Sequence, residues 1–181
     1  MNLIFLAIFS SILKRATMAN SKSFLKLISQ TPYSLVLFKT SGCGECKQLL
    51  AILDQITDKY AEKISMIIVD SEVSSDISQN YSVAEIPSIG VFGGGRFIQF
   101  YQGEWTEVKI VEFCDSLLSQ KPDILNDIFD VYSFQNKQPA NLIIFDPNQV
   151  DVGNTLLRQF AGRLQIGILK NESIKRYIGI S

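Results

Sequence analysis

Two cysteines separated by two residues are the clearest source of chemistry in this chain. Cys43 and Cys46 occur as Cys-Gly-Glu-Cys, and the third cysteine, Cys114, lies far from them in the sequence. A thiolate is a nucleophile that attacks disulfides, and a second thiol close by can release the product of that attack. The motif therefore indicates thiol–disulfide exchange.

The rest of the composition removes most other kinds of catalysis. The 181 residues include no histidine, which excludes Ser-His-Asp and Cys-His catalysis and His-ligated zinc or haem. Lys and Arg number 17 against 18 Asp and Glu, so no basic field exists for nucleic acid or an anionic membrane. A hydrophobic content of 46% is enough for a core. We expect no cofactor, no metal and no nucleic-acid partner.

The N-terminus carries an apolar run at 3–13 that ends at two basic residues. Its 11 residues are too few for a membrane-spanning helix, which needs about 20, but they match the apolar part of a signal peptide. Small residues at 17 and 19 would allow cleavage after Ala19. The run also fits a buried or frayed helix, or an extension upstream of a start at Met18. We place residues 1–19 outside the predicted fold.

Helix and strand patterns alternate around the cysteines. Helices are predicted at 20–29, 43–59, 76–81 and 106–119, and strands at 34–38, 64–69, 88–92 and 96–101. The last two strands flank three glycines, as in a β-hairpin. This order predicts a mixed sheet with helices on both faces, in which the first two strands are parallel.

In this order Cys43 follows a strand and a glycine turn and begins a helix. The free N–H groups and the positive dipole end at a helix N-terminus stabilise a thiolate there. Cys46 lies one turn later and can reach a mixed disulfide on Cys43. We therefore assign attack to Cys43 and release to Cys46. Cys114 falls on the apolar face of its helix, and we interpret it as a core residue.

Three other interpretations of the cysteine pair remain open. A zinc site needs four ligands, and a chain with three cysteines and no histidine cannot complete an ordinary one. A purely structural disulfide would close a two-residue loop, which constrains the unfolded chain very little. The third interpretation is a module of the same fold that binds other proteins without redox chemistry.

Four motifs follow one another in the first two thirds of the chain. They are the Cys43–Cys46 motif, Val69 and Asp70, the segment 81–88 (YSVAEIPS) and the segment 101–104 (YQGE). With these motifs the segment 34–118 resembles the thioredoxin superfamily, and most closely a catalytic domain of the protein disulfide isomerases. The resemblance implies protein substrates that carry thiols or disulfides, together with glutathione or a redox partner protein.

The resemblance also implies a substrate-binding loop. Taken alone, Pro87 could equally be a trans residue that begins a strand. By resemblance, the Ile86–Pro87 peptide bond is cis, and this loop faces the cysteines and pairs with an extended substrate backbone. A cis bond before proline is disfavoured by only about 0.5–1 kcal/mol, so a turn can hold it.

Two positions depart from the family pattern. Glu45, beside Gly44, stands where the isomerases usually carry histidine and the thioredoxins proline. Its negative charge is expected to raise the pKa of Cys43 relative to the isomerases and to make the disulfide less oxidising. Leu37 stands where family members keep a buried carboxylate for proton transfer. Lys39 and Glu45 are titratable groups nearby, and the sequence assigns that work to neither.

Residues 122–181 predict a second, smaller unit without cysteines. A helical stretch is predicted at 123–132, strands at 141–145 and 166–169, and helices at 153–160 and 171–177. The β-α-β-α order repeats residues 34–81 and stops before the last strands and helix. In the isomerase family such units support substrate binding, and an open sheet would expose unpaired strand edges. The alternative is a divergent extension with no role of its own.

We therefore predict an α/β protein with a thioredoxin fold. Residues 1–19 are a candidate signal peptide, 20–121 a thioredoxin domain, and 122–181 an incomplete, redox-inactive thioredoxin-like domain. The predicted activity is that of a protein disulfide isomerase that assists oxidative folding in the endoplasmic reticulum lumen or secretory pathway, with no stable membrane span. The alternatives are a cytosolic thioredoxin-like reductant that starts at Met18 and a redox-inactive binding or chaperone module.

Overall fold

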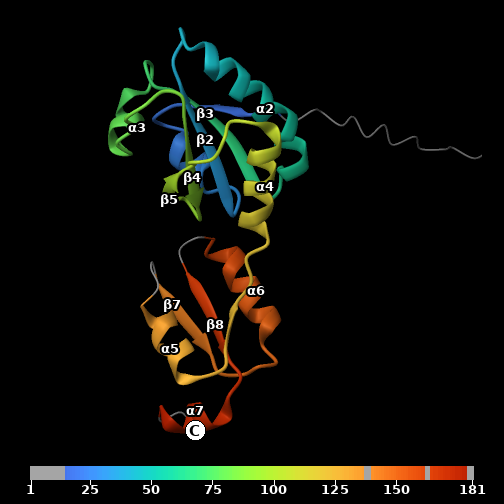
Figure 1. Cartoon of the computed structure of the whole chain (residues 1–181). Helices are drawn as coiled ribbons and strands as arrows, with labels where there is room; N and C mark the ends of the chain where they lie inside the picture. The colour runs from blue at the N-terminus through green and yellow to red at the C-terminus, as the bar shows by residue number, and fades with distance from the viewer. Residues whose placement is uncertain (1–14, 137–139, 162–163, 179–181) are drawn as a thin grey trace, which may run out of the picture.

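The computed structural model describes residues 15–136, 140–161 and 164–178. These residues form two units that follow one another along the chain (Figure 1). The first contains a five-stranded sheet in the order β1-β3-β2-β4-β5, and the second a three-stranded sheet in the order β6-β8-β7. The apolar run at 3–13 lies outside the described residues.

Strands and helices alternate along both units, except that β4 is followed directly by β5. The first unit contains β1 (Thr17–Ala19), α1 (Phe24–Leu27), β2 (Tyr33–Lys39), α2 (Gly44–Tyr60), β3 (Ile64–Asp70), α3 (Ser75–Asn80), β4 (Ser88–Gly93), β5 (Arg96–Phe100) and α4 (Glu107–Leu118). The second contains β6 (Asp123–Leu125), α5 (Ile128–Gln135), β7 (Asn141–Ile144), α6 (Val150–Gln159), β8 (Gln165–Leu169) and α7 (Glu172–Tyr177). Within these ranges no helix is both long enough and apolar enough to cross a membrane.

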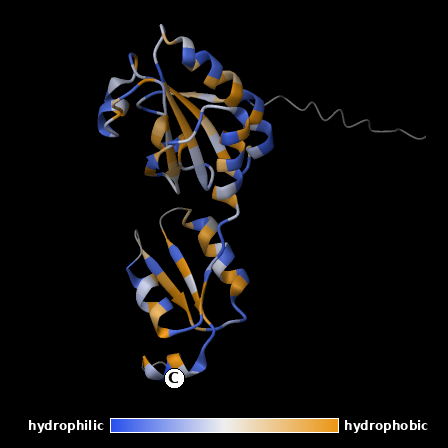
Figure 2. Cartoon of the chain, viewed as in Figure 1, coloured by the Kyte–Doolittle hydropathy of each residue, from blue (hydrophilic) through white to orange (hydrophobic). Residues whose placement is uncertain are grey.

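Strand β2 lies at the centre of the first sheet and directs the packing on both faces. It runs parallel to β3 and antiparallel to β4, with Leu37 opposite Ile68 on one side and Ile89 on the other. Because side chains alternate along a strand, Leu35 and Leu37 pack with α2 and α4, whereas Val36 and Phe38 pack with α1 and α3. The apolar strands between two layers of helices are visible in Figure 2. The predicted mixed sheet with helices on both faces is confirmed.

The N-terminal boundary of this unit corrects one expectation. Residues 17–19, which were placed outside the fold, form the edge strand β1 and pair with β3 in parallel. The backbone N–H of Ala16 donates to Asp54 Oδ1 at 2.9 Å, and Ala19 is buried. Cleavage after Ala19 would therefore remove an ordered strand from the sheet.

The start of the second unit corrects another expectation. The predicted helix at 123–132 is in fact β6 followed by α5. Asp127 separates them, because its side chain accepts the N–H of Asp130 at 2.8 Å and caps α5. Strand β6 pairs with β8, so the sheet order β6-β8-β7 repeats β1-β3-β2 of the first unit. The internal repeat thus begins one strand earlier than the sequence suggested.

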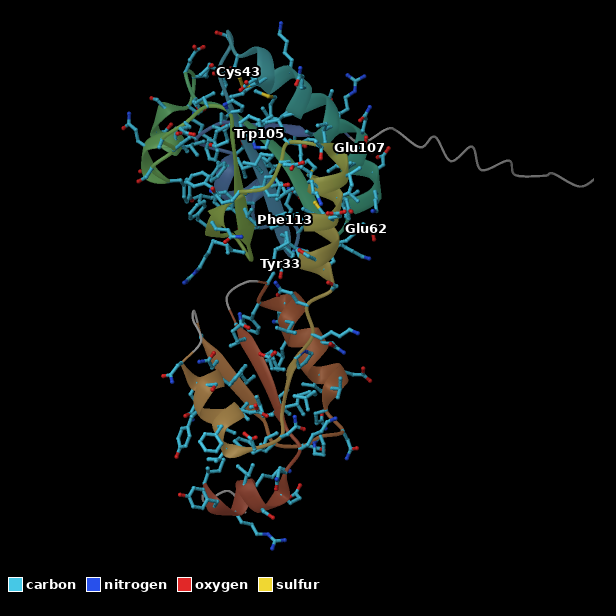
Figure 3. All side chains as sticks on the ribbon, viewed as in Figure 1. Tyr33, Cys43, Glu62, Trp105, Glu107 and Phe113 are labelled. Atoms are coloured by element: carbon cyan, nitrogen blue, oxygen red, sulfur yellow. A yellow bond between two sulfur atoms is a disulfide. The ribbon has the colours of Figure 1, made fainter. Side chains whose placement is uncertain are left out.

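The second unit packs against the end of the first unit that lies away from Cys43 (Figure 3). Ala161 is fully buried in the same apolar cluster as Tyr33, the first residue of β2. The Tyr33 hydroxyl donates to Gln120 Oε1 at 3.1 Å. A side chain on Gly93 would collide with the Ala161 carbonyl, so glycine permits the close approach of the two units.

Candidate redox site

Cys43 and Cys46 form a disulfide at the start of helix α2. Cys43 is the N-cap residue of α2, with extended backbone angles, and Cys46 lies in the first turn of the helix. Their Cα atoms are 5.3 Å apart. The two cysteines that the sequence paired are thus brought together where the chain passes from strand β2 to α2.

The two sulfurs differ in exposure. Cys43 is half-buried, whereas Cys46 is only 2% exposed. The backbone N–H of Cys46 donates to Cys43 Sγ at 3.0 Å. A free N–H at the N-terminus of a helix stabilises negative charge, so this contact supports a thiolate on Cys43 when the disulfide is reduced.

Two polar contacts join the segment before Cys43 to the end of β3 and the loop that follows it. Ser41 Oγ donates to Glu72 Oε2 at 2.8 Å. Lys39 Nζ donates to Asp70 Oδ2 at 2.6 Å, and the two strands end at these residues. The Lys39 hydrogen bond holds the pKa of Asp70 below its usual value. These contacts hold the segment that leads from β2 to Cys43.

The position of the family carboxylate is apolar in this chain. Leu37 is fully buried and Met66 is 2% exposed, and both belong to the cluster under α2 and α4. A carboxylate at Leu37 would stand in this apolar layer without a charged partner in the cluster. At the position of Leu37 there is therefore no carboxylate that could transfer a proton to or from Cys46.

The Ile86–Pro87 peptide bond is cis, as the resemblance implied. Pro87 is buried, and Ile86 is half-buried against the cluster that contains Phe38 and Phe92. The Ile86 side chain packs on this core. A substrate would therefore contact the backbone of Ile86 and not its side chain.

A groove of about 390 Å³ runs beside the proline loop. Its walls are the segment before β4 and the segment between β5 and α4. The lining residues are Ser82, Ala84, Glu85, Pro87, Ser88, Phe100, Tyr101, Gln102, Gly103 and Trp105. Trp105 is 40% exposed, and in the view of Figure 3 it lies between Cys43 and Tyr33. The sequence analysis missed Trp105, although it is the only tryptophan of the chain and directly follows the YQGE motif.

The residues between the cysteines are open to solvent. Gly44 and Glu45 are exposed, and a Cβ placed on Gly44 would meet no atom within 4 Å. The Glu45 carboxylate lies in the first turn of α2, as the sequence placed it. Because this carboxylate is exposed, solvent and salt screen its effect on Cys43.

Cys114 takes no part in this site. It is a free thiol in α4 with no exposed surface, which confirms its interpretation as a core residue. Burial raises the pKa of its thiol to about 12, so it remains protonated at neutral pH. In the described part of the chain, no three Cys, Asp or Glu side chains group together in a way that could hold a metal ion.

A family model and the sequence relatives of this chain agree on one family. The thioredoxin family model matches residues 15–116. Chloroplastic thioredoxin Y of Oryza sativa subsp. japonica is 25% identical over 84 residues, which cover 46% of this chain and 50% of that protein. Chloroplastic M-type thioredoxin of Chlamydomonas reinhardtii is 27% identical over 85 residues, which cover 47% of this chain and 61% of that protein. The chain therefore spans less than two thirds of the length of either relative.

Two solved structures share the fold. Human ERp44 in a zinc-bound form has a TM-score of 0.63 at 16% identity, and the match covers 92% of this chain and 48% of that one. A point mutant of the thioredoxin from Halobacterium salinarum has a TM-score of 0.52 at 16% identity, and the match covers 57% of this chain and 89% of that one. The ERp44 match therefore extends over both units of the chain, whereas the two sequence relatives are thioredoxins matched over about half of it.

Proposed function

Since this chain belongs to the thioredoxin family and carries a thioredoxin-like cysteine pair, we propose that it exchanges disulfides with protein substrates in the manner of a protein disulfide isomerase. The observation that carries the proposal is the unequal exposure of the two sulfurs. A half-buried Cys43 caps α2, and the buried Cys46 is joined to it. A substrate can reach Cys43, and Cys46 can then reach the sulfur of Cys43 from inside.

The exchange proceeds in two steps. The Cys43 thiolate attacks one sulfur of a substrate disulfide, which forms a bond between Cys43 and the substrate and releases the other substrate sulfur as a thiolate. The Cys46 thiolate then attacks Cys43 Sγ, which releases the second substrate sulfur and forms the Cys43–Cys46 disulfide. The two released thiolates take up the two protons that the cysteines gave up. Two electrons pass to the substrate, and the reverse sequence oxidises it.

We propose that the groove beside Pro87 holds the substrate during this exchange. Pro87 and Trp105 both line the groove, and they come from its two different walls. Backbone groups of the proline loop together with an exposed aromatic face suit an extended peptide. The support for an isomerase-type protein, rather than a single thioredoxin domain, is the match to ERp44 across 92% of the chain. On the same basis we propose that the chain divides near residue 121, with β1 included in the first domain. The apolar run at 3–13 supports residence in the endoplasmic reticulum lumen or secretory pathway.

A thioredoxin-type reductant is the second candidate, and two observations favour it. The sequence relatives are chloroplast and bacterial thioredoxins. Strand β1 also contains the position at which a signal peptide would be cut after Ala19. A protein that retained β1 would therefore need a different cleavage position or none.

Trapping of the mixed disulfide tests the proposed function. With Cys46→Ser, the first step still occurs and the second does not, so a protein with scrambled disulfides should accumulate as a covalent complex through Cys43. Cys43→Ser should form no complex, and Cys114→Ser should turn over like the parent chain. If Cys46→Ser traps no substrate, or if Cys43→Ser traps as much, the assignment of the two roles is wrong.

A further inference from the structure

A partly buried ion pair joins the ends of β2 and β3. Lys39 is the last residue of β2 and Asp70 the last of β3, and they stand opposite each other in the parallel register. Their side chains are 21% and 16% exposed, and Nζ lies 2.6 Å from Oδ2. Asp70 also accepts the backbone N–H groups of Glu72 and Val73 at 3.1 and 3.4 Å.

This pair lies at the same end of the sheet as the disulfide. The carboxyl ends of the parallel strands β2 and β3 meet there, and Cys43 follows Lys39 by four residues. Four residues span at most about 14 Å even when fully extended. On the core side, Leu37 and Met66 provide only apolar surface.

Other charged groups in the neighbouring segments are more exposed. The exposed carboxylates and ammonium groups of these segments are Glu45, Lys47, Glu72, Glu85 and Glu104. Solvent and salt screen such groups, whereas a partly buried pair is screened much less. Lys39 and Asp70 carry opposite charges, so their contributions to the field at Cys43 oppose each other.

We propose that Lys39 and Asp70 are positioning residues that balance each other's charge beside Cys43 and so set the reduction potential of the Cys43–Cys46 pair. This inference rests on the proposed function. Asp70 neutralises the ammonium group that would otherwise stabilise the Cys43 thiolate. Lys39 neutralises the carboxylate that would otherwise destabilise the Cys43 thiolate. The network also holds the backbone that leads to Cys43.

Removal of one partner shifts the reduction potential of the Cys43–Cys46 pair, and the direction of the shift depends on which partner is removed. Asp70→Asn leaves a cation beside Cys43, which stabilises the thiolate of the reduced form and makes the disulfide more oxidising. Lys39→Met leaves an anion there and has the opposite effect. A loosening of the structure alone would not produce shifts of opposite sign.

The test uses the full chain and two readouts. The first is the pKa of Cys43, from the pH dependence of its alkylation in the reduced protein. The second is the equilibrium constant for oxidation of the dithiol by glutathione disulfide, which consumes one glutathione disulfide and yields two glutathione molecules. We expect Asp70→Asn to lower that constant by about three- to tenfold and Lys39→Met to raise it by a similar factor. Lys39→Met with Asp70→Asn should return it close to the parent value.

Matched controls separate charge from general disturbance. Lys59 forms an ion pair with Asp115 near the end of α2. It lies 16 residues from Cys43, which is about 24 Å of helix. Lys59→Met should leave both readouts unchanged, and Lys39→Arg should retain the parent values. Urea unfolding establishes that each variant is folded, and Lys39→Gln replaces Lys39→Met if the latter is not.

The outcomes distinguish this inference from the proposed function. If the parent disulfide forms and exchanges with substrate but the two single variants shift the constant in the same direction, or not at all, the charge balance is refuted and the function stands. If the parent forms no disulfide in any glutathione buffer, the function itself is refuted.

Discussion

The backbone N–H of Cys46 donates to Cys43 Sγ at 3.0 Å, so the buried cysteine contacts the half-buried one through the main chain as well as through the disulfide. Both groups belong to the first turn of α2, where the dipole of the helix favours negative charge. The Glu45 carboxylate lies in the same turn and opposes that effect, but it is exposed. The N–H of Cys46 and the dipole of α2 therefore both favour a thiolate on Cys43 in the reduced protein.

Cys114 should resist alkylation in the folded protein. Burial raises the pKa of its thiol from 9.0 to about 12, which lowers the thiolate fraction at pH 8 by about 1,000-fold. With Cys43 and Cys46 kept as a disulfide, iodoacetamide at pH 8 should add no label to the native chain and one label to the chain in urea. Rapid labelling of the native chain would show that α4 opens readily or that the thiol is not buried.

The same burial makes stability depend on alkaline pH. Between pH 9 and about 12, the unfolded chain loses the Cys114 proton while the folded chain keeps it. The unfolded state then binds fewer protons, so the free energy of unfolding falls as the pH rises through this range. Cys114→Ala should reduce this fall in the free energy of unfolding, measured by urea unfolding at pH 8, 9 and 10. The slope should not vanish, because burial also raises the pKa of Tyr60 and Tyr101.

Trp105→Ala should weaken the binding of an extended peptide that carries a disulfide. The indole lines the groove beside Pro87 and is 40% exposed, so a substrate can cover what remains of its surface. We expect KM to rise by about five- to thirtyfold, which corresponds to roughly 1–2 kcal/mol of lost apolar contact. Exchange with glutathione, which is too small to span the groove, should change little.

Phe129→Ala is the matched control for this variant. Phe129 is an aromatic residue on α5 with 76% exposure, and it lies in the second unit. Its removal should leave the KM for the peptide unchanged. Equal effects of the two substitutions would show that the groove is not the binding surface.

Gly93→Ala should destabilise the contact between the two units without affecting the redox pair. The added Cβ would collide with the carbonyl of Ala161, so the backbone of one unit must shift. We expect the free energy of unfolding to fall by about 1–3 kcal/mol in urea. The reduction potential should stay constant, because this contact lies at the opposite end of β2 from Cys43. Gly42→Ala, where a Cβ meets no atom within 4 Å, is the control for stability.

A chain that begins at Asn20 should be less stable than one that begins at Arg15. The shorter chain lacks β1, its pairing with β3 and the hydrogen bond from Ala16 to Asp54. The expected loss is roughly 1–3 kcal/mol in the free energy of unfolding, from a few lost hydrogen bonds and the apolar contact of Ala19. Equal stability of the two chains would make cleavage after Ala19 fully compatible with the fold.

The core of the first unit and its cysteine site could be predicted because their signals are local. The buried strand β2, the glycine turn and the helical spacing of α2 all lie close to Cys43 in the sequence. Strand β1 gave no such signal, since it has three residues and two of them are exposed. Strand β6 was mistaken for helix because Ile124 and Leu125 also fit the apolar side of a helix. Only the parallel pairing with β8 and the cap at Asp127 decide between the two.

The groove and the ion pair required the tertiary structure. Trp105 and Pro87 lie 18 residues apart, and they line one groove because β4 and β5 form a hairpin between them. Lys39 and Asp70 are 31 residues apart and meet because β2 and β3 are paired in one register. A shift of one residue in that register would place Lys39 opposite a different residue. Spacing along the chain does not reveal such relationships.

The reduction potential of the Cys43–Cys46 pair tests the central claim most directly. The full chain would be equilibrated in graded glutathione buffers, and its free thiols would be counted by mass. An isomerase-type protein should form the Cys43–Cys46 disulfide reversibly with a potential near roughly −180 to −200 mV. A value near about −270 mV would instead identify a thioredoxin-type reductant. Failure to form the disulfide in any buffer would contradict the redox function altogether.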